Sequence, residues 1–153
     1  MSAENAIKFG IGPVALSPSP IRRDWILEGD PVASNKLLSA SADGTTTSYI
    51  WHCTAGRFNW FYDVDETIYV IEGGVVIIDM EGTAHRLGAG DTIFFPAGTH
   101  AEWKIESYIR KVAFIRTPLP RSLLLVRRGY RFLKRLTGNG NGAQEGAAMF
   151  QNS

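Results

Sequence analysis

The stretch GRFNWFYDVDETIYVIEGGVVIIDMEGTAHRLGAGDTIFFPAG, residues 56–98, decides the fold class of this chain. Its apolar segments are short, rich in Val, Ile and aromatic residues, and separated by Gly and Asp, which is the pattern of strands joined by turns. The pattern continues on both sides of the stretch. Segments that qualify as strands are 45–53, 59–64, 67–72, 75–80, 84–88, 91–95, 102–106 and 110–115. About eight short strands with this spacing predict a sandwich or a closed barrel.

The chain has enough apolar material for one domain of ordinary size. It has 153 residues, 44% of them hydrophobic, with 4 Trp, 5 Tyr and 8 Phe, so it can build a core without disulfides. Cys53 is the only cysteine, and we expect it to be a small buried apolar residue. We expect a cytoplasmic protein, because the first residues lack the apolar run of a secretory signal and no window is apolar enough to span a bilayer.

Charge divides the chain near Pro118 and Pro120. Residues 1–120 contain 10 Lys and Arg against 14 Asp and Glu, whereas residues 121–153 contain 6 Lys and Arg and a single acidic residue, Glu145. The two prolines break any regular element between these parts. We therefore predict four parts: an N-terminal arm (1–44), a barrel (45–117), a basic amphipathic helix (118–137) and a disordered tail (138–153).

Three interpretations of the basic helix remain open. Its Leu and Val residues recur with helical spacing, and Arg and Lys occupy most other positions of 121–136. In the first, the helix packs on its own acidic barrel or across a homodimer. In the second, residues 121–136 contact an anionic membrane surface. Nucleic-acid binding is disfavoured, because a basic helix without a docking motif lacks a recognition signal.

Two spacings inside the opening stretch indicate which barrel this is. Glu66 is followed by Gly73 with TIYVIE between them, and Gly90 is followed by Pro96 and Gly98 after DTIFF. With these spacings the chain resembles the cupin family, in particular the single-domain relatives of the (S)-ureidoglycine aminohydrolase type. The residues that carry the resemblance are Trp51, Cys53, Gly56, Phe58, Trp60, Asp65, Glu66, 69–73, Gly90, Asp91, 95–98, Trp103, Arg110 and Lys111.

The resemblance covers about residues 45–116 and implies an all-β fold. The expected architecture is an RmlC-like jelly-roll barrel, the double-stranded β-helix of cupins, to which the periodicity adds a short C-terminal amphipathic helix. The aminohydrolase activity itself is not carried over. The characterised enzyme has two cupin domains and uses metal-ligand histidines, whereas this chain has one such domain.

The histidines that hold the metal ion in most cupins are absent from this sequence. The resemblance places those of the first motif on Trp60 and Tyr62, or on Asn59 and Phe61 if the spacing shifts by one, and that of the second motif on Ala101. We therefore predict no metal site and no cofactor.

Two histidines near the motifs are the remaining metal-ligand candidates. His100 misses the second-motif position by one residue, which on a strand turns the side chain to the opposite face. We expect it to face away from Glu66. A metal site would need an unforeseen contribution from His52 or His100, because one aligned carboxylate does not hold a transition metal.

Glu66 itself is the centre of the candidate site. A carboxylate inside a barrel is unfavourable unless it is paired or hydrogen-bonded. The resemblance indicates Lys111 as the partner, and Tyr62 is also within reach. Two interpretations stay open: a buried structural ion pair, or a pair in which Glu66 and Lys111 do acid-base or hydrogen-bonding work on a bound molecule.

Three aromatic residues are expected to line the same interior: Trp60, Tyr62 and Trp103. Large aromatic side chains inside a small barrel either fill it as core or leave an aromatic box around the carboxylate. Such a box would favour a cationic, amine or ureido group, because a cation is attracted to ring faces and to the carboxylate.

Three functions follow from these observations. The first is a cupin that binds a small polar metabolite with an amine or ureido group. The second is a metal-free or atypical enzyme, a hydrolase or isomerase of a small nitrogenous or sugar compound, that uses Glu66 and Lys111. The third is an interaction protein with a structural barrel. A homodimer is the expected assembly, and an open interior would favour the first two functions.

The first prediction concerns metal content. Because Trp60, Tyr62 and Ala101 stand where ligands are needed, the purified and dialysed protein should carry far less than one Mn, Fe, Ni or Zn ion per chain. Elemental analysis measures this, and close to one ion per chain would contradict it.

Overall fold

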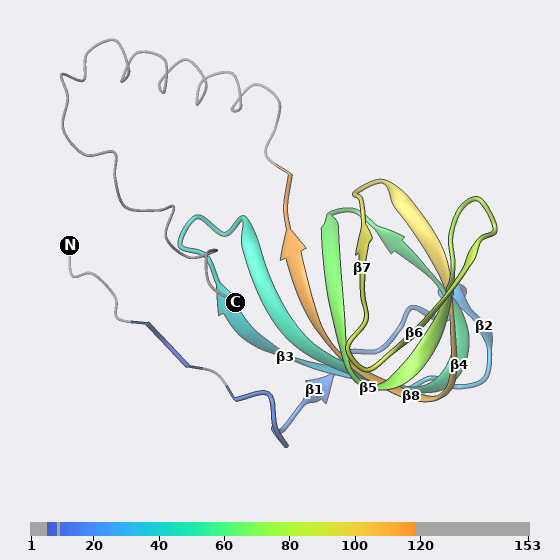
Figure 1. Ribbon diagram of the computed structural model, residues 1–153, viewed down its shortest axis with the longest axis horizontal. Helices are drawn as coiled ribbons and strands as arrows, with labels where there is room; N and C mark the ends of the chain where they lie inside the picture. Colours follow the sequence, from blue (N-terminus) through green and yellow to red (C-terminus); the bar gives the residue numbers. More distant parts are fainter. Residues whose placement is uncertain (1–5, 9, 119–153) are drawn as a thin grey trace, which may run out of the picture. The chain divides into compact units, whose positions relative to one another are not determined.

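The computed structural model describes residues 6–8 and 10–118, and this part of the chain is almost entirely antiparallel β structure (Figure 1). The predicted all-β jelly roll is confirmed. The elements are β1 (Ser17–Pro18), a 3-10 turn η1 (Arg23–Trp25), β2 (Ile26–Glu28), β3 (Ala33–Ala40), β4 (Thr46–Tyr62), β5 (Asp65–Ile78), β6 (Ala84–Gly88), β7 (Thr92–Phe95) and β8 (Thr99–Arg116). The predicted basic helix and tail lie outside the described residues, apart from Pro118. No helix within the described ranges is long and apolar enough to cross a membrane.

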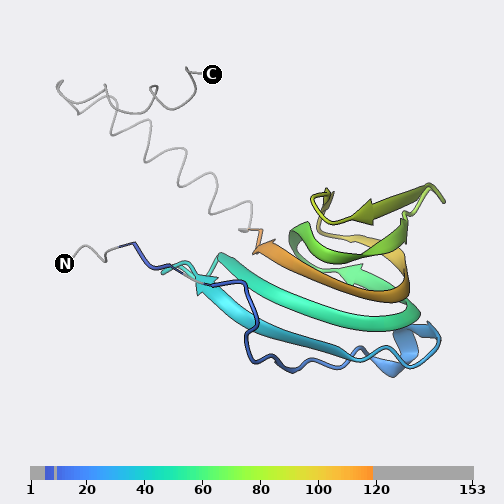
Figure 2. The same cartoon turned by 60° about the horizontal axis from the view of Figure 1, so that its bottom comes forward.

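Three long strands organise the sheet. The strand order is β1-β3-β4-β8-β5-β6, with β2 paired to β4 and β7 paired to β5. Strand β8 therefore lies between β4 and β5, as Figure 1 shows, and is antiparallel to both. Figure 2 shows the long strands as curved ribbons. Because each one bends, its two halves contribute to opposite walls of the barrel, and side chains on the inner face of both halves meet in one interior.

The long strands differ from the short ones that the sequence predicts. Segments 45–53 and 59–64 overlap the two halves of β4, segments 67–72 and 75–80 overlap β5, and 102–106 and 110–115 lie within β8. The register shifts between Thr54 and Gly56 in β4 and on either side of Gly73 in β5. Glycine here permits a bulge and a bend inside a continuing strand, a role that sequence does not distinguish from a turn.

The predicted N-terminal arm contributes strands to the sheet. Strand β3 pairs with the first half of β4, from Ala33 opposite Cys53 to Ala40 opposite Thr47, and β2 pairs with the second half of β4. The sheet therefore begins before residue 45, where we placed the start of the barrel. Part of the arm acts as an edge cover, since β1 pairs with β3 at the outer edge of the sheet.

The core lies between the two walls of the barrel. Its fully buried members are Phe58, Ile68, Val70, Ile77, Trp103, Ile109 and Cys53. Cys53 is the small buried residue that we expected, and burial raises the pKa of its thiol to about 12. Such a thiol stays protonated at neutral pH and is a poor nucleophile.

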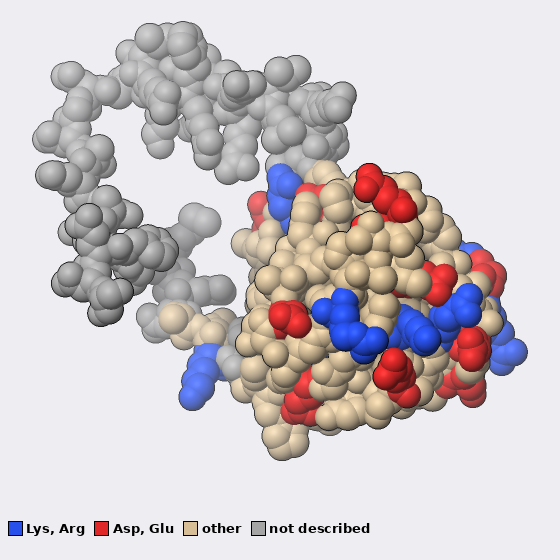
Figure 3. Space-filling model, turned by 45° about the vertical axis from the view of Figure 1, so that its right-hand side comes forward, with Lys and Arg blue, Asp and Glu red and all other residues tan. Residues whose placement is uncertain are grey.

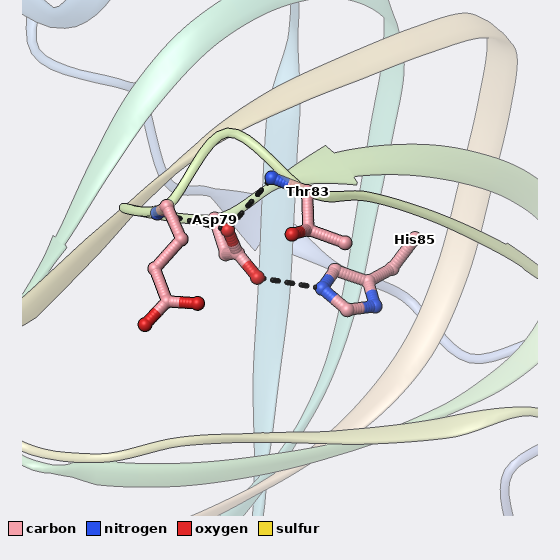
Figure 4. A network of polar contacts seen from close by, with 4 residues as sticks. Asp79, Thr83 and His85 are labelled. Atoms are coloured by element: carbon pink, nitrogen blue, oxygen red, sulfur yellow. Dashed lines mark hydrogen bonds and ion pairs between the residues drawn. The ribbon is translucent and has the colours of Figure 1, made fainter.

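The hairpin between β5 and β6 is closed by polar contacts away from this core (Figure 4). The carboxylate of Asp79 accepts hydrogen bonds from the backbone N–H groups of Glu81 and Thr83, both at 2.9 Å, and lies 2.8 Å from Nε2 of His85. The contact with His85 is the main reason that the pKa of Asp79 is lowered. His85 therefore stabilises a turn and has no part in the barrel interior.

The second prediction tests whether Gly73 is needed for the bend in β5. Gly73 has φ +71°, and a Cβ atom there would clash with the backbone oxygen of Tyr108. Gly82 has a similar φ, +81°, but open space around it. Gly82→Ala should therefore lower the free energy of unfolding only by the cost of a left-handed backbone conformation, about 1–2 kcal/mol. Gly73→Ala should lower it by roughly 1–3 kcal/mol more, because of the clash. Urea unfolding of both variants measures the difference, and equal losses would contradict the steric argument.

Candidate functional site

A cavity of about 220 Å³ lies inside the barrel. Its walls are mainly aromatic: Tyr49, Trp51, Phe58, Trp60 and Trp103. The polar and charged groups that line it are Ser19, Asn35, Glu66 and Lys111, next to Ala113 and Ile115. At roughly 30 Å³ per water molecule the cavity has room for about seven waters, or for an organic molecule with a similar number of non-hydrogen atoms.

Strand register brings the charged and polar residues to one face. Residues directly opposite each other on paired strands share a face of the sheet. Asn35, Trp51 and Lys111 form one row across β3, β4 and β8, and Glu66 of β5 lies opposite Ile115 of β8. Lys111 and Ile115 lie on the inner face of β8, so the Lys111 side chain can reach Glu66 along that face.

Glu66 and Lys111 form a buried ion pair. Nζ of Lys111 lies 2.6 Å from Oε1 of Glu66, and their side chains are only 6% and 8% exposed. Ala113 occupies the inner face of β8 between Lys111 and Ile115, and its small side chain leaves space in which the two long side chains meet. The contact that the sequence predicted between Glu66 and Lys111 is confirmed.

Surface charges of this protein are paired in a different environment. Figure 3 shows Lys and Arg side chains beside Asp and Glu on one face of the molecule. Arg57, for example, contacts Glu102 at 2.8 Å and Glu28 at 3.4 Å, with 42% of the Arg57 side chain exposed. Exposed pairs of this kind contribute little to stability because water screens them. The Glu66–Lys111 pair is far less exposed, at 6% and 8% of its side chains, and is therefore screened less.

Two indole rings complete the surroundings of the ammonium group. Nζ of Lys111 lies 4.9 Å from the ring centroid of Trp51 and 4.9 Å from that of Trp103, within the range of cation–π attraction. An aromatic box with a carboxylate is therefore present, as the sequence suggested. The cation inside it in this structure is the protein's own Lys111, and the expectation of a cationic ligand stays a prediction.

The three predicted aromatic residues have different positions. Trp60 is half-buried and lines the cavity, with its ring edge-on to Trp51 at 6.1 Å. Trp103 is buried, and its Nε1 donates a hydrogen bond to the hydroxyl of Tyr62 at 3.0 Å. Tyr62 is not among the lining residues; its ring stacks on Phe95 at 4.3 Å. Burial, with a smaller contribution from the charge of Glu66, raises the pKa of Tyr62 well above its ordinary value.

The residues at the metal-ligand positions do not fit a transition metal. Trp60 has no donor atom for a metal, Ala101 is buried and offers none, and the Tyr62 hydroxyl is protonated and bonded to Trp103. The one carboxylate, Glu66, is already bound to an ammonium group. Within residues 6–8 and 10–118, no three His, Cys, Asp or Glu side chains come together to hold a metal ion.

The two candidate histidines face the outside of the barrel. His100 is exposed, lies opposite Phe61 in the sheet and stacks on its ring at 5.4 Å. It therefore faces away from Glu66, as predicted. His52 stacks on Tyr108 at 6.0 Å and lies between the inward-facing Trp51 and Cys53 on β4, which turns it to the outer face.

Sequence reasoning missed several lining residues. Trp51 was assigned only to the family pattern, although it is the cross-strand neighbour of Lys111. Asn35 and Ser19 were placed in the arm and therefore outside the site. Side chains alternate between the two faces of a strand, so an inward Lys111 would have placed Ala113 and Ile115 on the inner face as well. Sequence analysis could therefore have predicted these two.

Comparison with known proteins agrees with this architecture. A family model described as the EutQ-like cupin domain matches residues 40–113. This part of the chain is therefore similar to a cupin domain. The match begins at Ala40, the last residue of β3, and so leaves out β1, β2 and most of β3. The narrower resemblance to the (S)-ureidoglycine aminohydrolase type stays a prediction, because the matching family is the EutQ-like one.

Solved structures show the same cupin fold. A DUF861-family protein of unknown function from Pseudomonas syringae pv. tomato is 24% identical with a TM-score of 0.62, and the match covers 67% of this chain and 44% of that chain. The EutQ protein of Clostridium difficile is 24% identical with a TM-score of 0.50, covering 56% of this chain and 63% of that chain. A putative ethanolamine utilization protein Q from Salmonella typhimurium is 18% identical with a TM-score of 0.51, covering 67% and 94%.

The comparisons establish the fold and leave the activity open. This chain spans less than two thirds of the length of the Clostridium and Pseudomonas proteins. No curated protein matches it. The site must therefore be interpreted from its own residues.

The third prediction concerns the coupling of the buried pair. Lys111→Met leaves the Glu66 carboxylate buried without a partner and should destabilise the domain by roughly 3–5 kcal/mol, and adding Glu66→Gln should recover part of that loss. Arg116→Met is the matched control, because it breaks an exposed pair with Asp65 and should cost less than about 1 kcal/mol. Urea unfolding of wild type, Glu66→Gln, Lys111→Met and the double variant completes the cycle, with Arg116→Met measured beside it. Additive losses at Glu66 and Lys111 would show that the two residues are not coupled.

Proposed function

We propose that the barrel cavity binds a small, neutral, polar molecule that carries an amide or ureido group. The observation that supports this proposal is the position of the Glu66–Lys111 pair, which is buried yet lines a cavity of about 220 Å³. A purely structural ion pair needs no cavity beside it. A cavity of this size also argues against the third function, an interaction protein with a filled barrel.

The hydrogen-bonding capacity of the pair defines the ligand. An ammonium group has three N–H donors, and within the described residues Lys111 uses one of them, toward Oε1 of Glu66. No side chain in that part of the chain donates to Oε2 of Glu66. The pair therefore presents a donor and an acceptor next to each other. An amide or ureido group presents an oxygen acceptor and an N–H donor in the same arrangement.

A second polar group lies on the opposite side of Trp51. Asn35 Nδ2 donates a hydrogen bond to Oγ of Ser19 at 3.1 Å, which leaves the Asn35 carbonyl oxygen and the Ser19 hydroxyl hydrogen for a ligand. Both residues line the cavity. A molecule with polar groups at two ends and a flat middle against the indole rings would satisfy both sides of the cavity.

The alternative function is acid-base catalysis without a metal. It is favoured by one observation: a carboxylate and an ammonium lie 2.6 Å apart, both largely buried, beside a cavity, the kind of pair that can exchange a proton with a bound substrate. The two functions share a ligand and differ in turnover, so a probe that binds and is then hydrolysed or isomerised would favour the enzyme.

The fourth prediction tests ligand binding with N-methylurea and acetamide as probes. Titration followed by NMR should shift the indole N–H resonances of Trp51 and Trp60, because their rings line the cavity. Glu66→Gln should weaken binding about tenfold or more, since it replaces a charge-assisted hydrogen bond. Arg116→Met, which changes only a partly exposed surface pair, should leave the affinity unchanged. Absence of any indole shift at probe concentrations that saturate other urea-binding sites, or equal binding by Glu66→Gln, would contradict the proposal.

A further inference from the structure

We propose that the ammonium group of Lys111 is a tethered cation that takes the place of the metal ion in this barrel. As a consequence, the site accepts a ligand through an oxygen atom and rejects amines. The first part stands on the geometry of the described residues alone, whereas the second part rests on the proposed function.

The charge of Glu66 requires a cation inside the barrel. A buried carboxylate without a counter-charge is strongly unfavourable, and Trp60 and Ala101 stand where the resemblance places ligands of a metal ion. Among the described residues that line the cavity, Lys111 is the one with a cationic side chain. It supplies the missing positive charge at 2.6 Å from Oε1.

The contacts of Nζ are those of a recognition site for an ammonium ion. A carboxylate lies on one side, and the faces of Trp51 and Trp103 lie at 4.9 Å on two others. Aromatic faces combined with a carboxylate are the arrangement by which proteins bind alkylammonium ligands. Here the ammonium belongs to Lys111 of β8. The small side chain of Ala113 leaves the space through which the Lys111 side chain reaches Glu66.

The tethered cation reverses the selectivity of the box. A free amine that enters the cavity meets the like charge of Nζ at short range, and this repulsion is strong because the pair is largely removed from water. The N–H groups of Lys111 that Glu66 does not use are donors, so they select an oxygen acceptor. A neutral amide oxygen satisfies them without adding net charge to the interior.

The fifth prediction is chemical rescue of Lys111→Ala by n-propylammonium. The substitution keeps Cβ and removes three methylene groups and the ammonium, which are the atoms of n-propylammonium. The variant should be strongly destabilised, and the ion should raise its melting temperature by about 5 °C at roughly ten times its dissociation constant. If the variant is unfolded at the start, the ion should restore the β-sheet circular dichroism. n-Propanol, which has a similar shape without the charge, should do neither, and wild-type protein should not respond to the ion.

Two variants separate charge from volume in this experiment. Lys111→Met fills the space with an uncharged side chain and should show no rescue. The double variant Glu66→Gln with Lys111→Ala keeps the space but lacks the carboxylate, so n-propylammonium should lose its effect. A response of the double variant equal to that of Lys111→Ala, a response of wild-type protein, or no response of Lys111→Ala would overturn the tethered-cation assignment.

A ligand measurement distinguishes this inference from the proposed function. N-methylurea should bind Lys111→Ala at least about tenfold more weakly than wild type, and saturating n-propylammonium should restore its affinity. Rescue of stability without any binding of N-methylurea to wild type would uphold the tethered cation and refute the proposed ligand class. Binding to wild type without rescue of the variant would do the reverse.

Discussion

The interior of this barrel depends on one interaction, the ion pair between Glu66 and Lys111. Each partner alone would be an uncompensated charge among indole rings, at large cost in free energy. Together they are held by a 2.6 Å contact and by two ring faces at 4.9 Å from the ammonium nitrogen. The cavity beside the pair exists because the aromatic walls pack on each other and on the ammonium and leave space above Ala113.

The topology of the sheet brings Glu66 and Lys111 together. Glu66 and Lys111 are far apart in sequence, and β8 joins them because it pairs with β4 along one edge and with β5 along the other. Irregularities at glycine positions lie inside β4 and β5, which continue through them so that their halves line opposite walls. Strand β8 contains no glycine and pairs with both, and its Trp103 ring lies 4.9 Å from Nζ of Lys111.

The loss of metal ligands and the presence of the lysine are two aspects of one arrangement. Where the histidine positions carry Trp60, Tyr62 and Ala101, aromatic surface replaces imidazole donors, and Tyr62 supports Trp103 through a hydrogen bond. Aromatic faces stabilise an ammonium group far better than a transition-metal ion, because the metal ion needs lone pairs of N, O or S donor atoms. The barrel interior thereby holds the ammonium of Lys111 between the Glu66 carboxylate and two indole rings.

The amino-acid sequence by itself determined the fold class and the outward position of His100, because spacing in a strand fixes the face of a side chain. It also indicated that a buried Glu66 needs a partner, and the family resemblance pointed to Lys111, with Tyr62 as the alternative. Only the tertiary structure decided that the predicted strands merge into long ones, that Asn35 and Ser19 of the arm join the site, that Tyr62 is excluded from it, and that the aromatic box already holds Lys111. These features depend on which strands are neighbours and on how far long side chains reach across them. Such distances arise from pairing between remote segments, which no local pattern contains.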